Sequence, residues 1–163
     1  MGITFNADEI FEMAEEIERN GAKFYREAAG NSSSKETKKM FLDMALMEDG
    51  HLKTFQLMRK ELAEAEKLTT TFDPDNQAAL YLQAMADSHG TEGRKKQTQK
   101  LTGDESVNEI LKIALEAEIN SVVFYTGLKE LVSARAGKNK IEDIIKEEIA
   151  HIGTIKSKMA NLT

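Results

Sequence analysis

Four long segments of the chain repeat apolar residues at steps of three and four positions, which is the periodicity of an α-helix with one buried face. They span about 7–29, 34–67, 106–134 and 140–161. Each starts with a Ser or Asn followed three positions later by Glu, the pattern of a helix N-cap with a capping box: Asn6/Glu9, Ser33/Glu36, Ser106/Glu109 and Asn139/Glu142. The only proline, Pro74, lies outside all four segments. The sequence therefore predicts an all-α fold.

The connections between these segments predict the topology. Short loops around 30–32 and 136–138 join the helices in pairs, and short loops make antiparallel neighbours. The pairs form one hairpin over 7–67 and a second over 106–161. A long crossover, 68–105, separates them and contains a predicted short helix from Pro74 to about Ser88. The 163 residues are thus expected to form a single antiparallel four-helix domain, 1–163.

The two hairpins are also a repeat with an offset of 100 residues. When 8–60 is aligned with 108–160, fourteen of 53 ungapped positions are identical. Two of the three histidines in the chain, His51 and His151, fall on each other in this alignment. An internal duplication implies a pseudo-twofold axis, so a group supplied by one hairpin should be met by its counterpart from the other.

Composition excludes several functional classes. The net charge of −6 argues against a nucleic-acid binder, because such a protein needs basic residues to neutralise phosphates. The absence of cysteine removes disulfides, thiol nucleophiles and Cys-ligated metal sites. No apolar stretch approaches the roughly 20 residues of a membrane span. No signal peptide is visible at the N-terminus, so we expect a cytoplasmic protein.

Polar residues interrupt the apolar faces of all four predicted helices at matched positions. The second and fourth helices each carry Glu-x-x-His, whose side chains share a helix face. The first and third helices each carry a glutamate four residues after an apolar position. The six residues are Glu18, Glu48, His51, Glu118, Glu148 and His151.

Such a set in a protein core needs compensation, because a buried carboxylate without a partner costs many kcal/mol. No Lys or Arg lies beside the four glutamates on these faces. Two divalent cations would balance the four negative charges with both histidines neutral. Carboxylate and imidazole suit iron, manganese or zinc. The sequence predicts two divalent ions, with iron, manganese and zinc all open.

With these residues in place, the chain resembles the ferritin-like superfamily, and within it the rubrerythrin-like di-iron carboxylate proteins that lack a rubredoxin domain. A glutamate from each of two helices and Glu-x-x-His from the other two is the ligand pattern of that superfamily. Further similarity lies in Phe24-Tyr25 and its repeat Phe124-Tyr125. The resemblance implies a ferritin-like four-helix bundle and favours iron over Mn or Zn as the metal. It also implies that Glu18 and Glu118 are terminal ligands, Glu48 and Glu148 bridge the two metals, and His51 and His151 each complete one metal.

The chain departs from that resemblance in two respects. Rubrerythrins that reduce peroxide carry an additional glutamate one turn after the terminal ligand of the third helix, where this chain has Ser121. They also carry a Cys-ligated iron that delivers electrons, and this sequence has no cysteine. An external electron donor is therefore expected, and the peroxidase type of ligand exchange is in doubt.

Tyr25 and Tyr125 lie two turns beyond Glu18 and Glu118 on the same helix faces. Core packing with a satisfied hydroxyl is the favoured interpretation of both. The alternative is a hydrogen bond next to the metals, or a radical-prone neighbour of them.

The sequence favours an oxidoreductase that acts on peroxide or dioxygen, or oxidises ferrous iron, with no residue beyond the metal ligands needed as a catalytic group. The alternative is a metal-binding protein without turnover, for iron sequestration, sensing or interaction. No nucleic-acid or membrane partner is expected, and a homodimer remains open.

Overall fold

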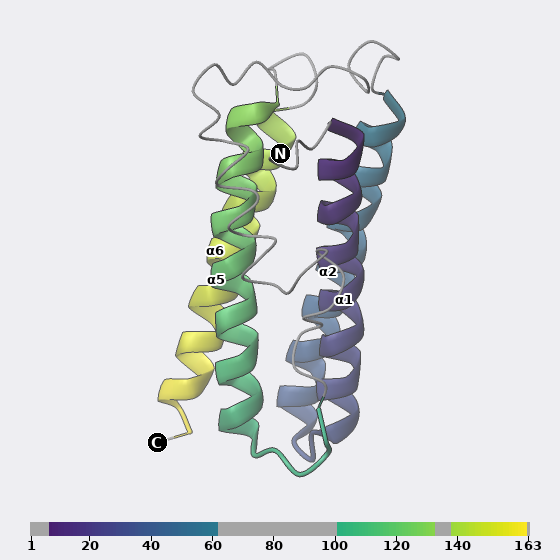
Figure 1. Cartoon of the computed structure of the whole chain (residues 1–163). Helices are drawn as coiled ribbons and strands as arrows, with labels where there is room; N and C mark the ends of the chain where they lie inside the picture. The colour runs from purple at the N-terminus through teal and green to yellow at the C-terminus, as the bar shows by residue number, and fades with distance from the viewer. Residues whose placement is uncertain (1–6, 62–100, 133–137, 163) are drawn as a thin grey trace, which may run out of the picture.

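In a computed structural model, the described residues 7–61, 101–132 and 138–162 form four helices (Figure 1). These are α1 (Ala7–Asn31), α2 (Lys35–Glu61), α5 (Val107–Leu131) and α6 (Lys138–Ala160). No strand occurs within these ranges, so the all-α prediction is confirmed for the part of the chain that is described. None of the described helices is long and apolar enough to cross a membrane.

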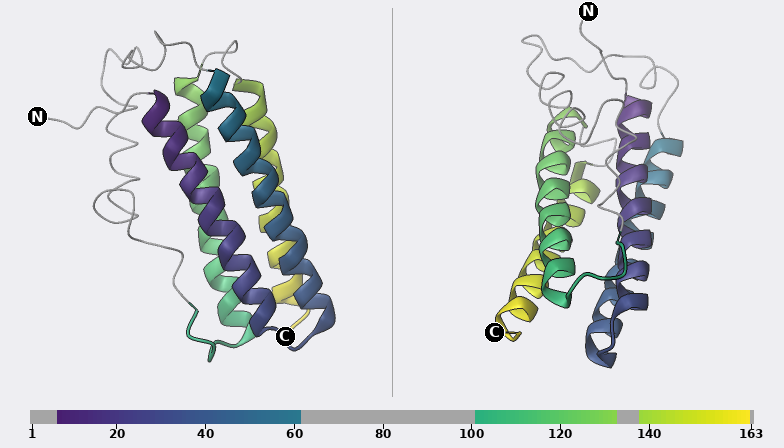
Figure 2. Two further views of the ribbon diagram at one scale, coloured as in Figure 1. Left: turned by 90° about the vertical axis from the view of Figure 1, so that its right-hand side faces the viewer. Right: turned by 60° about the horizontal axis from the view of Figure 1, so that its bottom comes forward.

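The helices are arranged as two antiparallel hairpins that lie side by side (Figures 1 and 2). Helices α1 and α2 form the first hairpin, and α5 and α6 form the second. Helix α1 faces α5 across the bundle, and α2 faces α6. The predicted crossover helix at 74–88 and the end of the second predicted helix, 62–67, lie outside the described residues.

The helix N-termini test the predicted capping pairs. Ser106 caps α5 with a complete capping box, since its side chain accepts from Glu109 N–H and the Glu109 carboxylate accepts from Ser106 N–H. Helix α2 begins one residue later than expected, and Ser34 Oγ rather than Ser33 accepts from Thr37 N–H at 3.3 Å.

The predicted cap at Asn139 is wrong, because α6 begins at Lys138 and Asn139 lies inside the helix. A cap pattern of two residues is short enough to occur by chance within a helix. Asn6 lies outside the described residues, so the first predicted cap stays a prediction.

Two apolar clusters fill the core, one toward each end of the bundle, and each draws residues from all four helices. The first contains buried residues of the start of α1 and the end of α2, with Phe11, Phe55, Phe124 and Ile144 among them. The second contains residues of the opposite ends of those helices: Phe24, Phe41, Met44, Ile110 and Ile155 among them. A fully buried side chain of this size contributes about 1.5–3 kcal/mol to folding. These clusters hold the hairpins together and leave a polar layer between them.

Candidate metal centre

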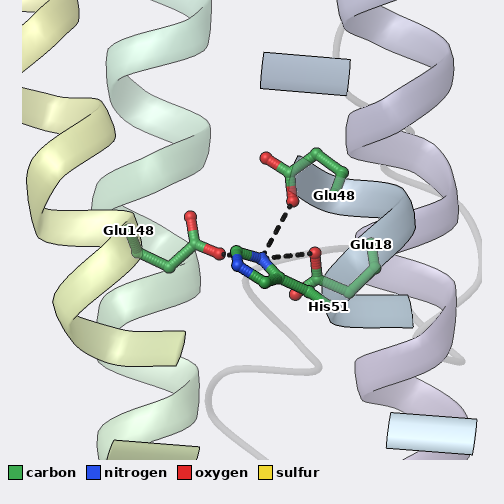
Figure 3. Close-up of side chains that lie close together, drawn as sticks. All are labelled: Glu18, Glu48, His51 and Glu148. Atoms are coloured by element: carbon green, nitrogen blue, oxygen red, sulfur yellow. Dashed lines mark ion pairs between the residues drawn. The ribbon is translucent and has the colours of Figure 1, made fainter. Parts of the chain in front are cut away.

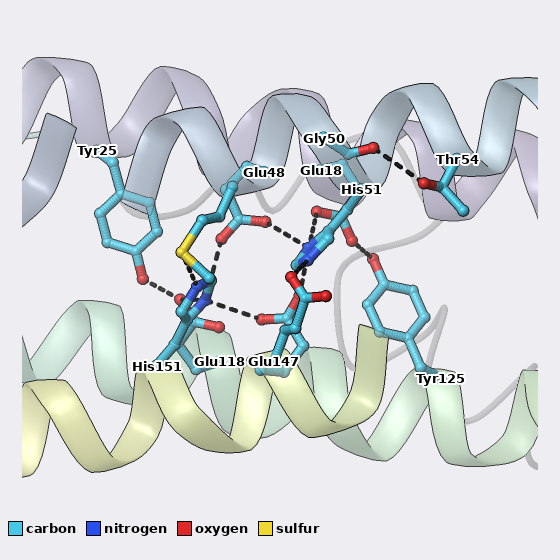
Figure 4. A network of polar contacts seen from close by, with 12 residues as sticks. Glu18, Tyr25, Glu48, Gly50, His51, Thr54, Glu118, Tyr125, Glu147 and His151 are labelled. Atoms are coloured by element: carbon cyan, nitrogen blue, oxygen red, sulfur yellow. Dashed lines mark hydrogen bonds and ion pairs between the residues drawn. The ribbon is translucent and has the colours of Figure 1, made fainter. Parts of the chain in front are cut away.

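The polar layer brings together all six residues predicted as ligands, one or two from each helix. Figure 4 labels five of them, and Figure 3 labels Glu148. Their ligand atoms form two overlapping groups in which every atom lies within 4.8 Å of the others. The first group is Glu18, Glu48, His51 and Glu148, shown in Figure 3, and the second is Glu48, Glu118, Glu148 and His151. Glu48 and Glu148 belong to both groups, so their carboxylates lie between two positions that could each hold an ion.

The site lies in the core because its residues share the helix faces that pack there. Glu48 and His51 are three residues apart on α2, and Glu148 and His151 are three apart on α6, so each pair points the same way. None of the six residues is more than 5% exposed. On every helix the site residues fall between the residues of the two apolar clusters, which shield the layer at both ends.

Both imidazoles present the same ring nitrogen to the cluster. Nδ1 of His51 lies 2.9 Å from Glu148 Oε1 and 3.4 Å from Glu18 Oε2. Nδ1 of His151 lies 3.4 Å from both Glu118 Oε1 and Glu148 Oε2. The rings are stacked with centroids 6.1 Å apart. In both cases Nε2 points outward, away from the shared carboxylates.

Several buried atoms of the cluster have no hydrogen-bond partner. They are Glu18 Oε2, both carboxylate oxygens of Glu148, and Nδ1 of His51 and His151. Each unsatisfied buried polar atom costs about 1–3 kcal/mol, more when it is charged. Five such atoms that converge on one space fit a bound cation, and the donor set of four carboxylates and two imidazoles suits iron, manganese or zinc.

Without metal, the histidines of the cluster hold protons strongly. Burial disfavours the charged form of His151, but the carboxylates of Glu118 and Glu148 outweigh it and raise its pKa to about 10. For His51 the effect of burial is likewise outweighed, and contacts with Glu148 and its neighbours raise the pKa well above the ordinary value. The metal-free cluster thus replaces metal charge with proton charge.

The carboxylates divide in the same environment. Burial, followed by the proximity of Glu148, raises the pKa of Glu118 to about 9. Burial also raises the pKa of Glu48. For Glu148 burial acts in the same direction, but the proximity of Glu118 and both imidazoles outweighs it and lowers the pKa. Glu148 therefore carries a negative charge between the two protonated imidazoles.

The two tyrosines join the hairpins across the bundle. Tyr25 on α1 donates its hydroxyl to Glu118 on α5, and Tyr125 on α5 donates to Glu18 on α1 (Figure 4). Both rings are fully packed in the core, as the favoured sequence interpretation holds. Each hydroxyl is also satisfied, as that interpretation expects, and its partner is one of the six predicted ligands. At Glu18 the phenol binds Oε1, and Oε2 lies 3.4 Å from His51 Nδ1. At Glu118 the phenol-bound Oε1 is also the oxygen that lies 3.4 Å from His151 Nδ1.

Two residues outside the predicted set also contact the site. Glu147 Oε2 lies 3.0 Å from His51 Nε2, and Met47 Sδ lies 3.3 Å from His151 Nε2. No sequence pattern signals these two contacts, because positions 47 and 147 are equivalent in the repeat but carry different residues, and each side chain reaches a histidine of the other hairpin. Ser121, predicted as a neighbour of the site, is half-buried on α5 and makes no hydrogen bond to the six described cluster residues.

The chain matches one family model and one solved structure. The Rubrerythrin family model matches residues 9–92. The crystal structure of a ferritin-like diiron-carboxylate protein from Thermotoga maritima has a TM-score of 0.72 to this structure, with 24% sequence identity over 100% of both chains. At that identity the likeness shows a shared fold. A search of curated proteins found no match.

Proposed function

The chain belongs to the Rubrerythrin family, and from this premise we propose that its buried cluster binds two iron ions and that the protein is an oxidoreductase. The substrate would be peroxide or dioxygen, or ferrous iron itself, with electrons from an external donor. The single observation that carries the proposal is the set of five buried, unpartnered ligand atoms that converge between the two hairpins.

The proposed ligand roles follow the two overlapping groups. Glu18 and His51 would hold one ion, and Glu118 and His151 would hold the other. Glu48 and Glu148 would bridge, since each belongs to both groups. Two divalent ions carry the +4 that offsets four ionised carboxylates, so the layer becomes neutral with both imidazoles uncharged.

Two bound iron ions would supply the two electrons that reduce peroxide to water, together with two protons. The protein residues define where this happens. Tyr25 and Tyr125 hold the terminal carboxylates in place, and the apolar clusters on either side keep bulk water away. The carboxylates carry the negative charge that offsets a rise in metal charge. The 163 residues contain no cysteine, so an electron source bound by thiolates must come from elsewhere.

The test is anaerobic loading with ferrous iron, followed by rapid mixing with peroxide or with dioxygen. We expect the absorbance of ferric iron to rise quickly with at least one oxidant and to cycle when a chemical reductant is added. The Glu48→Ala/Glu148→Ala variant should show neither. Glu142→Gln, which removes a charge from an exposed position of α6, is the matched control and should behave as the wild type.

Protein that binds two iron ions but oxidises them with neither reagent would overturn the oxidoreductase proposal. It would favour the second function drawn from the sequence, metal binding without turnover.

A further inference from the structure

The two halves of the cluster differ in the group behind each imidazole. His51 Nε2 faces the carboxylate of Glu147 at 3.0 Å (Figure 4). His151 Nε2 faces the thioether sulfur of Met47 at 3.3 Å. Positions 47 and 147 are equivalent in the repeat, so the pseudo-twofold symmetry of the six cluster residues ends at their outer neighbours.

This difference changes what each imidazole can offer a metal. When Nδ1 of a neutral imidazole is the ligand, the ring proton resides on Nε2. At His51 that N–H can donate to a carboxylate, which fixes the ring and makes its Nδ1 a stronger electron donor. At His151 the same N–H meets a thioether, which is only a weak acceptor.

The contacts also cross the bundle in opposite directions. Glu147 on α6 supports the histidine of α2, and Met47 on α2 covers the histidine of α6. Each outer residue therefore contacts a histidine of the opposite hairpin. Neither contact follows from the local sequence around its histidine. The Glu147 side chain is 50% exposed and Met47 is 37% exposed, so both positions accept substitution without a change in the core.

We propose that the two metal positions are inequivalent, and that Glu147 is the positioning residue that makes the position at Glu18 and His51 fill first and bind its ion more tightly. The position at Glu118 and His151, with Met47 behind it, fills second. This inference rests on the proposed di-metal site and adds an order to it.

The experiment is a zinc titration by calorimetry, with anomalous diffraction from crystals given one equivalent of zinc. Zinc has no redox chemistry, so the measurement reports binding alone. Wild-type protein should bind in two steps, with the first ion at the His51 position. Glu147→Met should weaken that step by roughly 10- to 100-fold, the usual effect of losing such an outer hydrogen bond. The double exchange Glu147→Met/Met47→Glu should reverse the order of filling.

Matched controls separate the contact from net charge. Glu142→Met removes a carboxylate from an exposed position of α6, and Leu46→Glu adds one at an exposed position of α2. Neither should change the order. Glu147→Gln keeps the shape and an acceptor oxygen, so it should give a smaller loss in the same direction and serves if the methionine variant unfolds.

Three results separate the possible failures. If the double exchange still fills the His51 position first, the inference is wrong. If Leu46→Glu combined with Glu147→Met reverses the order as the double exchange does, the effect is one of net charge and the inference is also wrong. Wild-type protein that binds no zinc and no ferrous iron would instead overturn the di-metal site on which the inference rests.

Discussion

The hairpins α1/α2 and α5/α6 are two copies of one structural unit, and some classes of residue are kept between them while others vary. Each supplies Glu, Glu-x-x-His and a tyrosine at equivalent positions, and each of these side chains is buried. The apolar positions around them are not identical: buried Phe41, Met44 and Phe55 correspond to buried Ile141, Ile144 and Ile155. The two units therefore agree in all six predicted ligands, whereas they agree at only some of the positions that fill space, such as Phe24 and Phe124.

That contrast has a physical cause. A packing position requires an apolar side chain of suitable volume, and neighbours can adjust to a change of shape at a cost below about 1.5 kcal/mol for volume-conserving exchanges. A ligand position requires a particular donor atom, because a lost carboxylate changes the charge balance of the whole cluster. The positions of Met47 and Glu147 are intermediate. Both side chains contact a histidine of the cluster, but neither belongs to the set of four carboxylates that would offset the metal charge.

The largest effect is expected where the hairpins share a role. Glu48→Ala or Glu148→Ala removes a carboxylate that belongs to both ligand groups, so bound metal should fall from two ions per chain to none. Glu18→Ala and Glu118→Ala each affect one group and should leave one ion. Metal analysis after anaerobic iron loading measures the stoichiometry, and anomalous diffraction locates the remaining ion. A Glu48→Ala protein that keeps one fully occupied ion would contradict the bridging role.

Metal-free protein should respond to pH with a definite sign. The pKa of Glu118 rises from 4.5 to about 9, and that of His151 rises from 6.5 to about 10. Each contribution to stability is complete below the ordinary pKa and is lost as the pH rises toward the folded-state pKa. The free energy of unfolding of metal-free protein should therefore fall between about pH 5 and pH 10, measured by urea denaturation at several pH values.

Metal should replace the protons and remove much of this loss. Binding of zinc or ferrous iron near neutral pH should release protons, which calorimetry in buffers of different ionisation enthalpy detects. At a hundredfold excess over the dissociation constant, binding stabilises the fold by about 2.7 kcal/mol. That corresponds to a rise in melting temperature of roughly 5–10 °C. An unchanged melting temperature in the presence of either metal would show that the cluster is not a metal site.

The sequence predicts the helices and the six cluster residues because both follow from local spacing. Helical periodicity sets the buried face, and Glu-x-x-His puts two donors on it. The 100-residue offset then pairs the hairpins. The partners of Tyr25 and Tyr125 could not be predicted in this way, because each hydroxyl reaches a helix of the opposite hairpin. The same holds for Glu147 and Met47, whose contacts depend on how α2 and α6 face each other.

The tyrosines give a smaller and more symmetrical test. Tyr25→Phe and Tyr125→Phe each remove the donor to one buried terminal carboxylate, which costs about 1–3 kcal/mol. Because the contacts are equivalent across the repeat, the two losses should agree within about 0.5 kcal/mol in urea denaturation of metal-free protein. A double-mutant cycle of Tyr25→Phe with Glu118→Leu, which has no acceptor oxygen, isolates the hydrogen bond. A coupling energy near zero would mean that the tyrosines contribute to stability through packing alone.

Ser121 tests whether reactivity depends on one further carboxylate. Peroxide-reducing rubrerythrins, which this chain resembles, carry glutamate at the corresponding position. An added carboxylate would offset the charge gained on oxidation. We therefore expect Ser121→Glu to react several-fold faster with peroxide relative to dioxygen, where tenfold equals about 1.4 kcal/mol of activation free energy. Stopped-flow rates with both oxidants measure the ratio. A variant that binds two iron ions with an unchanged ratio would place peroxide preference elsewhere.

The smallest expected effect concerns Gly21, the counterpart of Ser121 in the repeat. A Cβ atom at Gly21 would lie 3.3 Å from Glu48 Cδ, which is tighter than most such contacts. The neighbour is a side chain that can shift by a few tenths of an ångström, but it is also a proposed bridging ligand. Gly21→Ala should therefore weaken the binding of both ions slightly, by less than about tenfold or 1.4 kcal/mol. Position 121 already carries a Cβ, so Ser121→Ala is the matched control and should leave zinc affinity unchanged in calorimetry. Equal affinities for the two variants would mean that Glu48 yields freely, and that glycine at position 21 does not serve the site.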